Sequence, residues 1–356
     1  MNITMSIVLT CAQALSLLIL LPTIATAAPP PGIPDGWSDG YVYANGIRIH
    51  YYHATPAPGK PVIMMVHGVT DNGLCWTTLS WKLEKDYDIY MVDTRGHGLT
   101  DPFTPSDDGD TLIKDVVEFV KAMKFEKPIL MGHSMGGATV IRVGAEYPDL
   151  AKAIIVLDAG IGGPRGGRPG ARAPRGETNA AARTAERGAS AERSERSATT
   201  TAQSTERSGS PERAASAPDN LSVNMFGSPE TLVAQNNYKF EDLVATGQRR
   251  HPKWDIVDNQ YWALSKKQYH GAYSSEAFRV VMQGSMRTGD SLAKIPLPMI
   301  ILKADASPEA REAHKEAAKV MQKGKLVHIN GAGHNLHHDQ LNRTVEVLKE
   351  FLSTLQ

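Results

Sequence analysis

The sequence has no excess of either charge. Lys and Arg together number 38, and so do Asp and Glu, which makes the formal net charge zero. A chain without a global field does not attract nucleic acid or anionic lipid. We therefore expect a small, largely uncharged substrate and no nucleic-acid partner.

Cysteine is nearly absent as well. The two cysteines are Cys11 and Cys75, and Cys11 lies in the apolar N-terminal segment. A mature chain without that segment keeps one cysteine, which excludes an internal disulfide. Cys75 stands beside Trp76 among apolar residues, which predicts a buried structural thiol.

One long segment, residues 162–220, lacks leucine, isoleucine, valine, methionine and aromatic residues altogether. Such a segment cannot build a core, and its repeated Arg, Ala, Ser, Glu and Gly are typical of disorder. We expect a low-complexity, disordered insertion without a catalytic role. It separates the first part of the folded core (28–161) from the segments 221–292 and 293–356.

Residues 1–32 hold a long apolar run that no Lys or Arg precedes. Small residues follow the run, and Ala25-Thr26-Ala27 resembles a cleavage site. The pattern predicts a secretory signal peptide over residues 1–27, with an uncleaved N-terminal anchor as the alternative. Both predict export. We expect a secreted or periplasmic protein with no stable membrane insertion after cleavage.

Short apolar runs recur along the rest of the chain. They lie at 61–66, 87–93, 128–132, 153–159, 298–305 and 325–330. Runs of this length predict strands that are buried on both faces of a parallel sheet. Amphipathic helices are expected at 111–123 and 344–355, and Asn45-Gly46 predicts a tight hairpin turn. The fold class is therefore α/β, with a mostly parallel sheet flanked by helices.

Residues 221–292 interrupt the strand pattern with a helix-like, aromatic stretch, which predicts a small helical cap. Its aromatic residues are Trp254, Tyr261, Trp262, Tyr269, Tyr273 and Phe278. Because a binding pocket needs only a few such side chains, we expect them mainly to form the core of the cap itself.

The strongest chemical signal is Gly-His-Ser-Met-Gly at 132–136. It directly follows an apolar run and precedes a helix-compatible stretch, the setting of a nucleophile elbow with Ser134 as the nucleophile. The tight turn requires small residues two positions before and after the serine. The helix that begins there brings backbone N–H groups and a positive dipole end to a developing oxyanion. The alternative is an ordinary glycine turn between a strand and a helix.

An oxyanion hole needs two backbone N–H groups that face the elbow. His67-Gly68 ends the earlier run at 61–66. The residue after this pair is the usual donor, so we assign the N–H groups of Val69 and Met135. The alternative is a glycine loop without a role.

His334 is the predicted base. It follows the last apolar run in Gly331–His334, which fits the Ser, acid, His order that accompanies this elbow. His337 and His338 fall past the end of that run, and we expect them to be solvated. No acidic or cysteine cluster at ligand spacing supports a zinc site here, so no metal or cofactor is expected.

Four motifs occur in a fixed order along the chain. They are HGVTDNG (67–73), DTRGHG (93–98), GHSMGG (132–137) and GAGH (331–334). With them the chain resembles the α/β-hydrolase superfamily, outside residues 1–30 and the insertion. It looks most like bacterial cap-bearing hydrolases that carry HGxTDNGxCW, a Trp-SK-Q stretch in the cap and LKADA. The resemblance implies that Asp93 and Arg95 brace loops instead of reacting.

The resemblance leaves two candidates for the acid of a catalytic triad. Asp305 follows the run after the cap, where the acid of this fold often sits, but Ser307 occupies the usual position. Asp158 ends the run after the elbow helix, where some members of the fold carry the acid. The acid holds the imidazole tautomer and stabilises the imidazolium. We prefer Asp158 and keep Asp305 as the alternative. For each, a helix-capping or loop carboxylate is the non-catalytic interpretation.

These residues predict acyl transfer in two steps through an acyl-enzyme that water hydrolyses. A carboxylic ester or lactone is the expected substrate, ahead of amides and carbon–carbon bonds. The serine argues against the similar haloalkane dehalogenases and epoxide hydrolases, which carry aspartate at the elbow. Two alternatives are a ligand-binding receptor or scaffold of the same fold with little turnover, and an interaction protein that acts through residues 162–220.

Overall fold

The structure is a computed structural model that describes residues 30–161, 221, 223, 228–271 and 275–355. The predicted signal peptide (1–27) and the predicted disordered insertion (162–220) lie outside the described residues, and so does Tyr273. Within the described part of the chain, no helix is both long and apolar enough to cross a bilayer.

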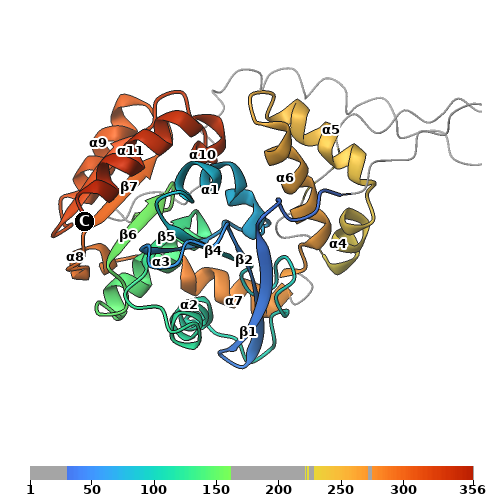
Figure 1. The fold of residues 1–356 in the computed structure, drawn as a ribbon, viewed down its shortest axis with the longest axis horizontal. Helices are drawn as coiled ribbons and strands as arrows, with labels where there is room; N and C mark the ends of the chain where they lie inside the picture. Colours follow the sequence, from blue (N-terminus) through green and yellow to red (C-terminus); the bar gives the residue numbers. More distant parts are fainter. Residues whose placement is uncertain (1–29, 162–220, 222, 224–227, 272–274, 356) are drawn as a thin grey trace, which may run out of the picture.

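An eight-stranded sheet forms the centre of the molecule (Figure 1). Its strands are β1 (Ser38–Ala44), β2 (Ile47–His53), β3 (Val62–Val66), β4 (Asp88–Val92), β5 (Ile129–His133), β6 (Ala153–Leu157), β7 (Met299–Lys303) and β8 (Gly324–His328). The strand order is β1-β2-β4-β3-β5-β6-β7-β8. The pairs β1–β2 and β2–β4 are antiparallel and all others are parallel, which confirms the predicted mostly parallel sheet.

The apolar runs became strands because the sheet is covered on both faces. Every residue of β5, β6 and β7 is buried, so neither face of these strands requires polar residues. At the edge, the β1–β2 hairpin turns through Asn45 and Gly46 with φ values of 46° and 76°. Two positive φ values in succession are what a tight type I′ turn requires, and the predicted hairpin is confirmed.

Helices pack against both faces of the sheet. They include α1 (Thr77–Leu83), α2 (Thr111–Ala122), α3 (Met135–Glu146), α8 (Ser291–Lys294), α9 (Pro308–Ala318), α10 (Leu336–Asp339) and α11 (Leu341–Ser353), with a 3-10 helix, η1 (Gly73–Trp76), before α1. One apolar layer joins α1 and α11 to the sheet, and the other joins α2, α3 and α8 to it. The predicted helices at 111–123 and near the C-terminus are confirmed.

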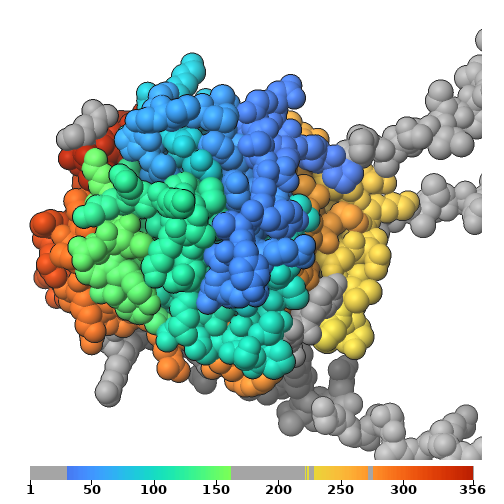
Figure 2. Space-filling model, turned by 60° about the horizontal axis from the view of Figure 1, so that its bottom comes forward, coloured from blue at the N-terminus to red at the C-terminus, as the bar shows by residue number. Residues whose placement is uncertain are grey.

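Four helices lie between β6 and α8 in the described part of the chain. They are α4 (Pro229–Asn236), α5 (Phe240–Arg250), α6 (Ile256–Gln268) and α7 (Ser275–Ser285). Helices α4, α5 and α6 gather at one side of the sheet, whereas α7 lies against α2 and α3 (Figure 1). In the space-filling view, the yellow residues of α4 and α5 form that side of the molecule, beyond the blue β1–β2 hairpin (Figure 2).

The predicted aromatic core of the cap is correct only in part. Trp254 and Trp262 do pack with Leu243 in a small core of their own. Tyr261 instead joins the main core, because α6 also packs against η1 and α1. Tyr269 and Phe278 pack with Met135, the residue after Ser134, because α7 lies on α3.

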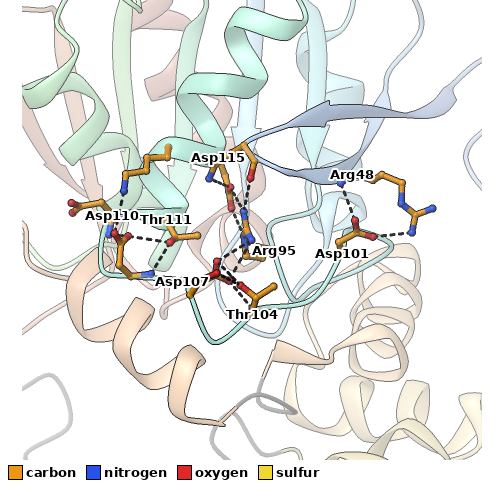
Figure 3. A network of polar contacts seen from close by, with 12 residues as sticks. Arg48, Arg95, Asp101, Thr104, Asp107, Asp110, Thr111 and Asp115 are labelled. Carbon is orange, nitrogen blue, oxygen red and sulfur yellow. Dashed lines mark hydrogen bonds and ion pairs between the residues drawn. The ribbon is translucent and has the colours of Figure 1, made fainter.

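Arg95 fastens the loop between β4 and α2. Its side chain is 3% exposed and lies between two carboxylates (Figure 3). Nε and Nη2 donate to Asp115 at 3.0 and 2.7 Å, and Nη1 donates to Asp107 at 3.1 Å. All of these contacts join one part of the scaffold to another, as the family resemblance implies for this residue.

Asp93 braces a second set of loops. One of its oxygens accepts the N–H of Gly73 at 2.7 Å, and the other accepts the N–H of Leu99 at 2.9 Å. The second oxygen also lies 2.8 Å from Nδ1 of the buried His50. Asp93 therefore ties the loop after β3, which borders the candidate site, to the loop after β4.

Candidate active site

Ser134 lies at the bend between β5 and α3. Its φ of 51° and ψ of −112° fall where residues other than glycine are rare. A Cβ atom on Gly132 would lie 2.2 Å from the carbonyl oxygen of Gly136, and one on Gly136 would lie 2.1 Å from that of Val66. Neither position can hold a side chain, so the tight turn predicted from the sequence is present.

Ser134 is also the N-cap residue of α3. Serine often caps a helix with its hydroxyl, but within the described residues Ser134 makes no side-chain capping bond to α3. The reason is its backbone, which departs from the extended conformation that capping residues adopt. The N–H of Met135 is among the first N–H groups of the helix, where the positive end of the helix dipole lies.

His334 and Asp158 form a hydrogen-bonded pair. His334 Nδ1 lies 2.7 Å from Asp158 Oδ2. A carboxylate can only accept, so Nδ1 carries the proton and the neutral ring keeps a free lone pair on Nε2. Asp158 directly follows β6, at the same edge of the sheet as Ser134, whose own N–H donates to the carbonyl of Leu157 at 2.9 Å.

The backbone of His334 lies beside the elbow. Its carbonyl oxygen accepts a hydrogen bond from Nε2 of His133, the residue before Ser134, at 3.0 Å. The rings of His133 and His334 are 4.7 Å apart between centroids. Burial, followed by the nearby His334, lowers the pKa of His133 to about 3, so His133 is a neutral neighbour. The structure thus brings the predicted base, from the far end of the chain, against the residue that precedes the predicted nucleophile.

A lysine that ends β7 also binds Asp158. Lys303 Nζ lies 2.8 Å from Asp158 Oδ1 and donates to the carbonyl of Ala159 at 3.0 Å, while the N–H of Ala304 donates to the same carboxylate oxygen at 3.1 Å. Burial opposes ionisation of Asp158, but the hydrogen bond from His334 and the charge of Lys303 outweigh it and hold the pKa well below its usual range. Asp158 is therefore an anion at neutral pH.

Asp305 lies in a different set of contacts. Its carboxylate accepts hydrogen bonds from Arg311 and from the N–H of Gly331, the latter at 2.8 Å. Its own N–H donates to the carbonyl of Ala332 at 2.9 Å. Asp305 thus braces the loop that leads to His334 instead of touching the imidazole. Ser307, at the position where the fold often has its acid, caps α9 by accepting the N–H of Ala310 at 3.3 Å.

The loop after β3 covers the elbow from the other side. A Cβ atom on Gly68 would lie 3.3 Å from the Cβ of Ser134, so the backbone of the loop runs close to the nucleophile. Val69 packs in the same apolar cluster as Met135. The two residues that the sequence assigned to an oxyanion hole thus belong to the same apolar cluster.

The prediction that His337 and His338 are solvated is wrong. They are 1% and 9% exposed, because both lie on α10, which begins at Leu336 and turns both rings inward. His337 lies against Trp76 with 4.8 Å between ring centroids, and His338 lies against Trp254 at 4.4 Å. Burial and the neighbouring His338 hold the pKa of His337 well below its usual range, so this ring is uncharged.

Cys75 is buried, as the sequence predicted, and burial raises the pKa of its thiol. This thiol is therefore protonated at neutral pH and is no nucleophile. Among the described residues, no group of three or more His, Cys, Asp or Glu is placed to hold a metal ion.

The contacts of Lys303 and Lys266 were not predicted from the sequence. Each is nearly buried, at 8% and 2% exposure, and each binds a residue of the candidate site or its border. Lys303 did carry a signal, because a charged residue ends an otherwise apolar strand there. The only sequence signal for Lys266 was its position in the Trp-SK-Q stretch of the predicted cap.

The whole pattern has a counterpart among known proteins. A model of the Alpha/beta hydrolase family matches residues 63–347, which include the elbow, Asp158 and His334. The chain belongs to the alpha/beta hydrolase family. This family match identifies the chain as a member of a hydrolase family. It does not identify the bond that the chain cleaves.

Relatives with assigned names are distant from this family member. Epoxide hydrolase 1 from Caenorhabditis elegans is 23% identical over 330 residues, which cover 92% of this chain and 73% of the relative. N-formylmaleamate deformylase from Pseudomonas putida is 32% identical over 127 residues, which cover 35% of this chain and 46% of the relative. The second match spans less than half of the deformylase.

Solved structures share the fold over most of the chain. That of E-2-(acetamidomethylene)succinate hydrolase has a TM-score of 0.59 and 16% identity, covering 89% of this chain and 99% of the other. The enol-lactonase from Burkholderia xenovorans LB400 has a TM-score of 0.53 and 16% identity, covering 88% and 100%. At these identities the likeness establishes the fold alone.

Proposed function

We propose that this alpha/beta hydrolase is an exported serine hydrolase that cleaves a small carboxylic ester or lactone through an acyl-enzyme. Ser134 is the nucleophile, His334 the base and Asp158 the acid. The observation that carries the proposal is the 2.7 Å pair of His334 and Asp158 at the same sheet edge as a strained, glycine-flanked serine.

The tautomer of His334 suits it to activate the serine. With Nδ1–H donated to Asp158, Nε2 takes the hydroxyl proton of Ser134 as Oγ attacks the acyl carbon. The carbonyl oxygen becomes an oxyanion, which accepts the N–H groups of Val69 and Met135. One such donor accounts for about 10²- to 10³-fold in kcat.

His334 next returns the proton that it took from the serine, and water then completes the cycle. The imidazolium of His334 protonates the leaving alkoxide as the carbon–oxygen bond breaks, and the acyl group stays on Ser134. A water molecule then gives its proton to Nε2 and attacks the acyl-enzyme. The acid product leaves and the serine recovers its proton. No group outside this chain and water takes part.

The serine favours acyl substrates over epoxides. Attack of a serine oxygen on an epoxide carbon would form an ether, which water does not cleave under mild conditions. Attack on an acyl carbon forms an ester that water can cleave, so only the acyl route turns over. Two of the similar proteins are named a deformylase and an enol-lactonase, and acyl transfer is compatible with both names.

Export belongs to the same proposal. It rests on the apolar run and the Ala25-Thr26-Ala27 pattern at residues 1–27, which predict a secreted or periplasmic enzyme after cleavage. The balanced charge supports a small-molecule substrate, with no nucleic-acid partner and no stable membrane insertion of the mature chain.

The test is a panel of p-nitrophenyl esters and lactones, assayed with the wild type and with Ser134→Ala. We expect turnover of at least one substrate and a loss of about 10⁴-fold or more in kcat for the variant. A wild type that binds panel members without turning any over would favour the receptor or scaffold alternative. Retained turnover after deletion of residues 163–220 would exclude an interaction role of that segment as the source of activity.

A further inference from the structure

Helix α6 sends a buried lysine to the loop that covers the elbow. Lys266 is 2% exposed, and its Nζ lies 2.8 Å from Thr70 O, 3.0 Å from Thr70 Oγ1 and 2.8 Å from Asp71 Oδ1. An ammonium group has three N–H donors. All three are therefore used on two residues of one loop, 195 and 196 positions away in the sequence.

The loop contains a strained turn. The N–H of Asp71 donates to the carbonyl of Gly68 at 3.2 Å, which closes a four-residue turn with Val69 and Thr70 at its centre. Thr70 has a φ of 68°, and a positive φ at this place in a turn favours glycine or asparagine over a β-branched residue. The turn therefore depends on contacts from outside it, and Lys266 supplies them to both the carbonyl and the hydroxyl of Thr70.

This turn sets the position of a proposed oxyanion donor. Gly68 lies close to Ser134, and Val69 packs against the apolar cluster that contains Met135. If Thr70 relaxed to a negative φ, the peptide between Val69 and Thr70 would rotate. Val69 would then move relative to the serine, and its N–H would leave the line toward the oxyanion.

Other contacts link the same loop to the cap. Asn72 Nδ2 donates to Gln268 Oε1 at 2.7 Å, at the end of α6. The carbonyl of Lys266 in turn accepts Asn236 Nδ2 of α4 at 2.9 Å. The turn is thus held by a helix that is itself held by its neighbour in the cap (Figure 1).

We propose that Lys266 is a positioning residue that holds the turn at 68–71 so that the Val69 N–H faces the oxyanion. The inference rests on the proposed function, because it assigns Lys266 a role in acyl transfer at Ser134. Lys266 acts through the loop and touches no reacting atom in this scheme.

The experiment compares Lys266→Met with Lys267→Met on the ester that the wild type hydrolyses best. Lys267 is a matched control on the same helix, because its Nζ binds the carbonyls of Asn236 and Tyr238 and none of the loop. We expect Lys266→Met to lower kcat by about 10²-fold with KM within a few-fold of wild type, as when one oxyanion donor is lost. The rate of fluorophosphonate labelling at Ser134 should fall in parallel. Lys267→Met should retain the wild-type kcat.

A second variant separates positioning from folding. Thr70→Gly in the Lys266→Met background places glycine where φ is positive, so we expect part of the lost kcat to return. If Lys266→Met does not fold, Lys266→Gln replaces it in both comparisons. A wild-type kcat in the Lys266 variant, a loss confined to KM, or no recovery with Thr70→Gly would each overturn the proposal.

These outcomes differ from a failure of the proposed function. If Ser134→Ala abolishes ester turnover while Lys266→Met matches the wild type, the proposal for Lys266 alone is wrong. If Ser134→Ala hydrolyses the ester as fast as the wild type, the proposed function and the role of Lys266 are both wrong.

Discussion

Asp158 is shared between a histidine and a lysine. His334 Nδ1 binds one carboxylate oxygen at 2.7 Å, and Lys303 Nζ binds the other at 2.8 Å. The positive charge of Lys303 helps to keep the carboxylate ionised and also opposes a positive charge on the imidazole. Lys303 is therefore expected to influence how His334 acts as the base.

The first prediction at this scale concerns the identity of the acid. Asp158→Asn should lower kcat by about 10⁴-fold, because an amide no longer selects the Nδ1–H tautomer of the histidine or stabilises its imidazolium. Asp305→Asn serves as the matched control, since Asp305 binds Arg311 and the Gly331 N–H. Steady-state kinetics of both variants measure the effect. A large loss of kcat in Asp305→Asn with little in Asp158→Asn would reverse the assignment.

The second prediction concerns Lys303. Lys303→Met removes a positive charge that opposes the imidazolium form of His334. With less positive charge beside the imidazole, the acidic limb of kcat/KM should move up by roughly one pH unit. Lys303→Arg keeps the charge and should leave the limb in place. A limb that is identical in all three proteins would contradict the proposed coupling.

The sequence contained the site residues but not their pairing. Asp158 and Asp305 both follow apolar runs, and only the strand order shows that β6 lies between β5 and β7 with Asp158 beside the serine. His337 and His338 were misplaced for a related reason. Their burial depends on a short helix, α10, that has too few residues to show a periodic pattern.

At the scale of elements, the loop between β4 and α2 is held by a buried charge network. Arg95 connects Asp107 in that loop to Asp115 on α2, and its Nη2 also donates to the carbonyl of Asn45 at 3.3 Å in the hairpin turn (Figure 3). Three separate elements are thus joined through one guanidinium.

We expect Arg95→Met to lower the free energy of unfolding by about 3–5 kcal/mol, because it leaves two buried carboxylates without their partner. Equilibrium unfolding in urea measures this loss. Arg48→Met is the control, because the Arg48–Asp101 pair lies at the surface with the arginine side chain 66% exposed, and it should change stability far less. Equal effects of the two substitutions would show that the Arg95 network is no more than a surface pair.

Strands could be predicted from the sequence better than some of the helices. The apolar runs of β3 to β7 reflect burial by the sheet, which leaves a direct mark on composition. Helix α9 has no buried residue, so no apolar periodicity could indicate it, and its start is set by the Ser307 cap. The aromatic residues of α6 could not be assigned to one core from the sequence, because this helix packs between two apolar cores.

At the scale of the whole molecule, buried histidines set how stability responds to acid. Burial lowers the pKa of each of four of them, His67, His97, His133 and His337. Below about pH 6.5 the unfolded chain binds a proton at each position and the folded chain does not. Stability therefore falls as the pH falls, by about 1.4 kcal/mol per pH unit for each such histidine.

His50 has the opposite effect on how stability depends on pH. Burial opposes its charge, but Asp93 and Asp39 on either side raise the pKa of His50 above its usual value. The stabilisation that it contributes is complete below about pH 6.5 and is lost as the pH rises through the folded-state pKa.

We expect His337→Leu to reduce the slope of the free energy of unfolding against pH by the share of one proton. The reason is that neither ring nitrogen of His337 has a hydrogen-bond partner in the described part of the chain. Urea unfolding between pH 5 and 7 measures the slope. His50→Gln should instead flatten the dependence above pH 6.5 and leave the lower range unchanged. An unaltered slope in His337→Leu would show that this ring is protonated in the folded protein.

The central claim is a covalent one, that Ser134 carries the acyl group. The most direct measurement is the intact mass of the protein after treatment with a fluorophosphonate, followed by peptide mapping. We expect the mass of one phosphonyl group to be added, on the peptide that contains Ser134, and no addition to Ser134→Ala. An unmodified wild type that still hydrolyses esters, or an adduct on another residue that stops turnover, would contradict it.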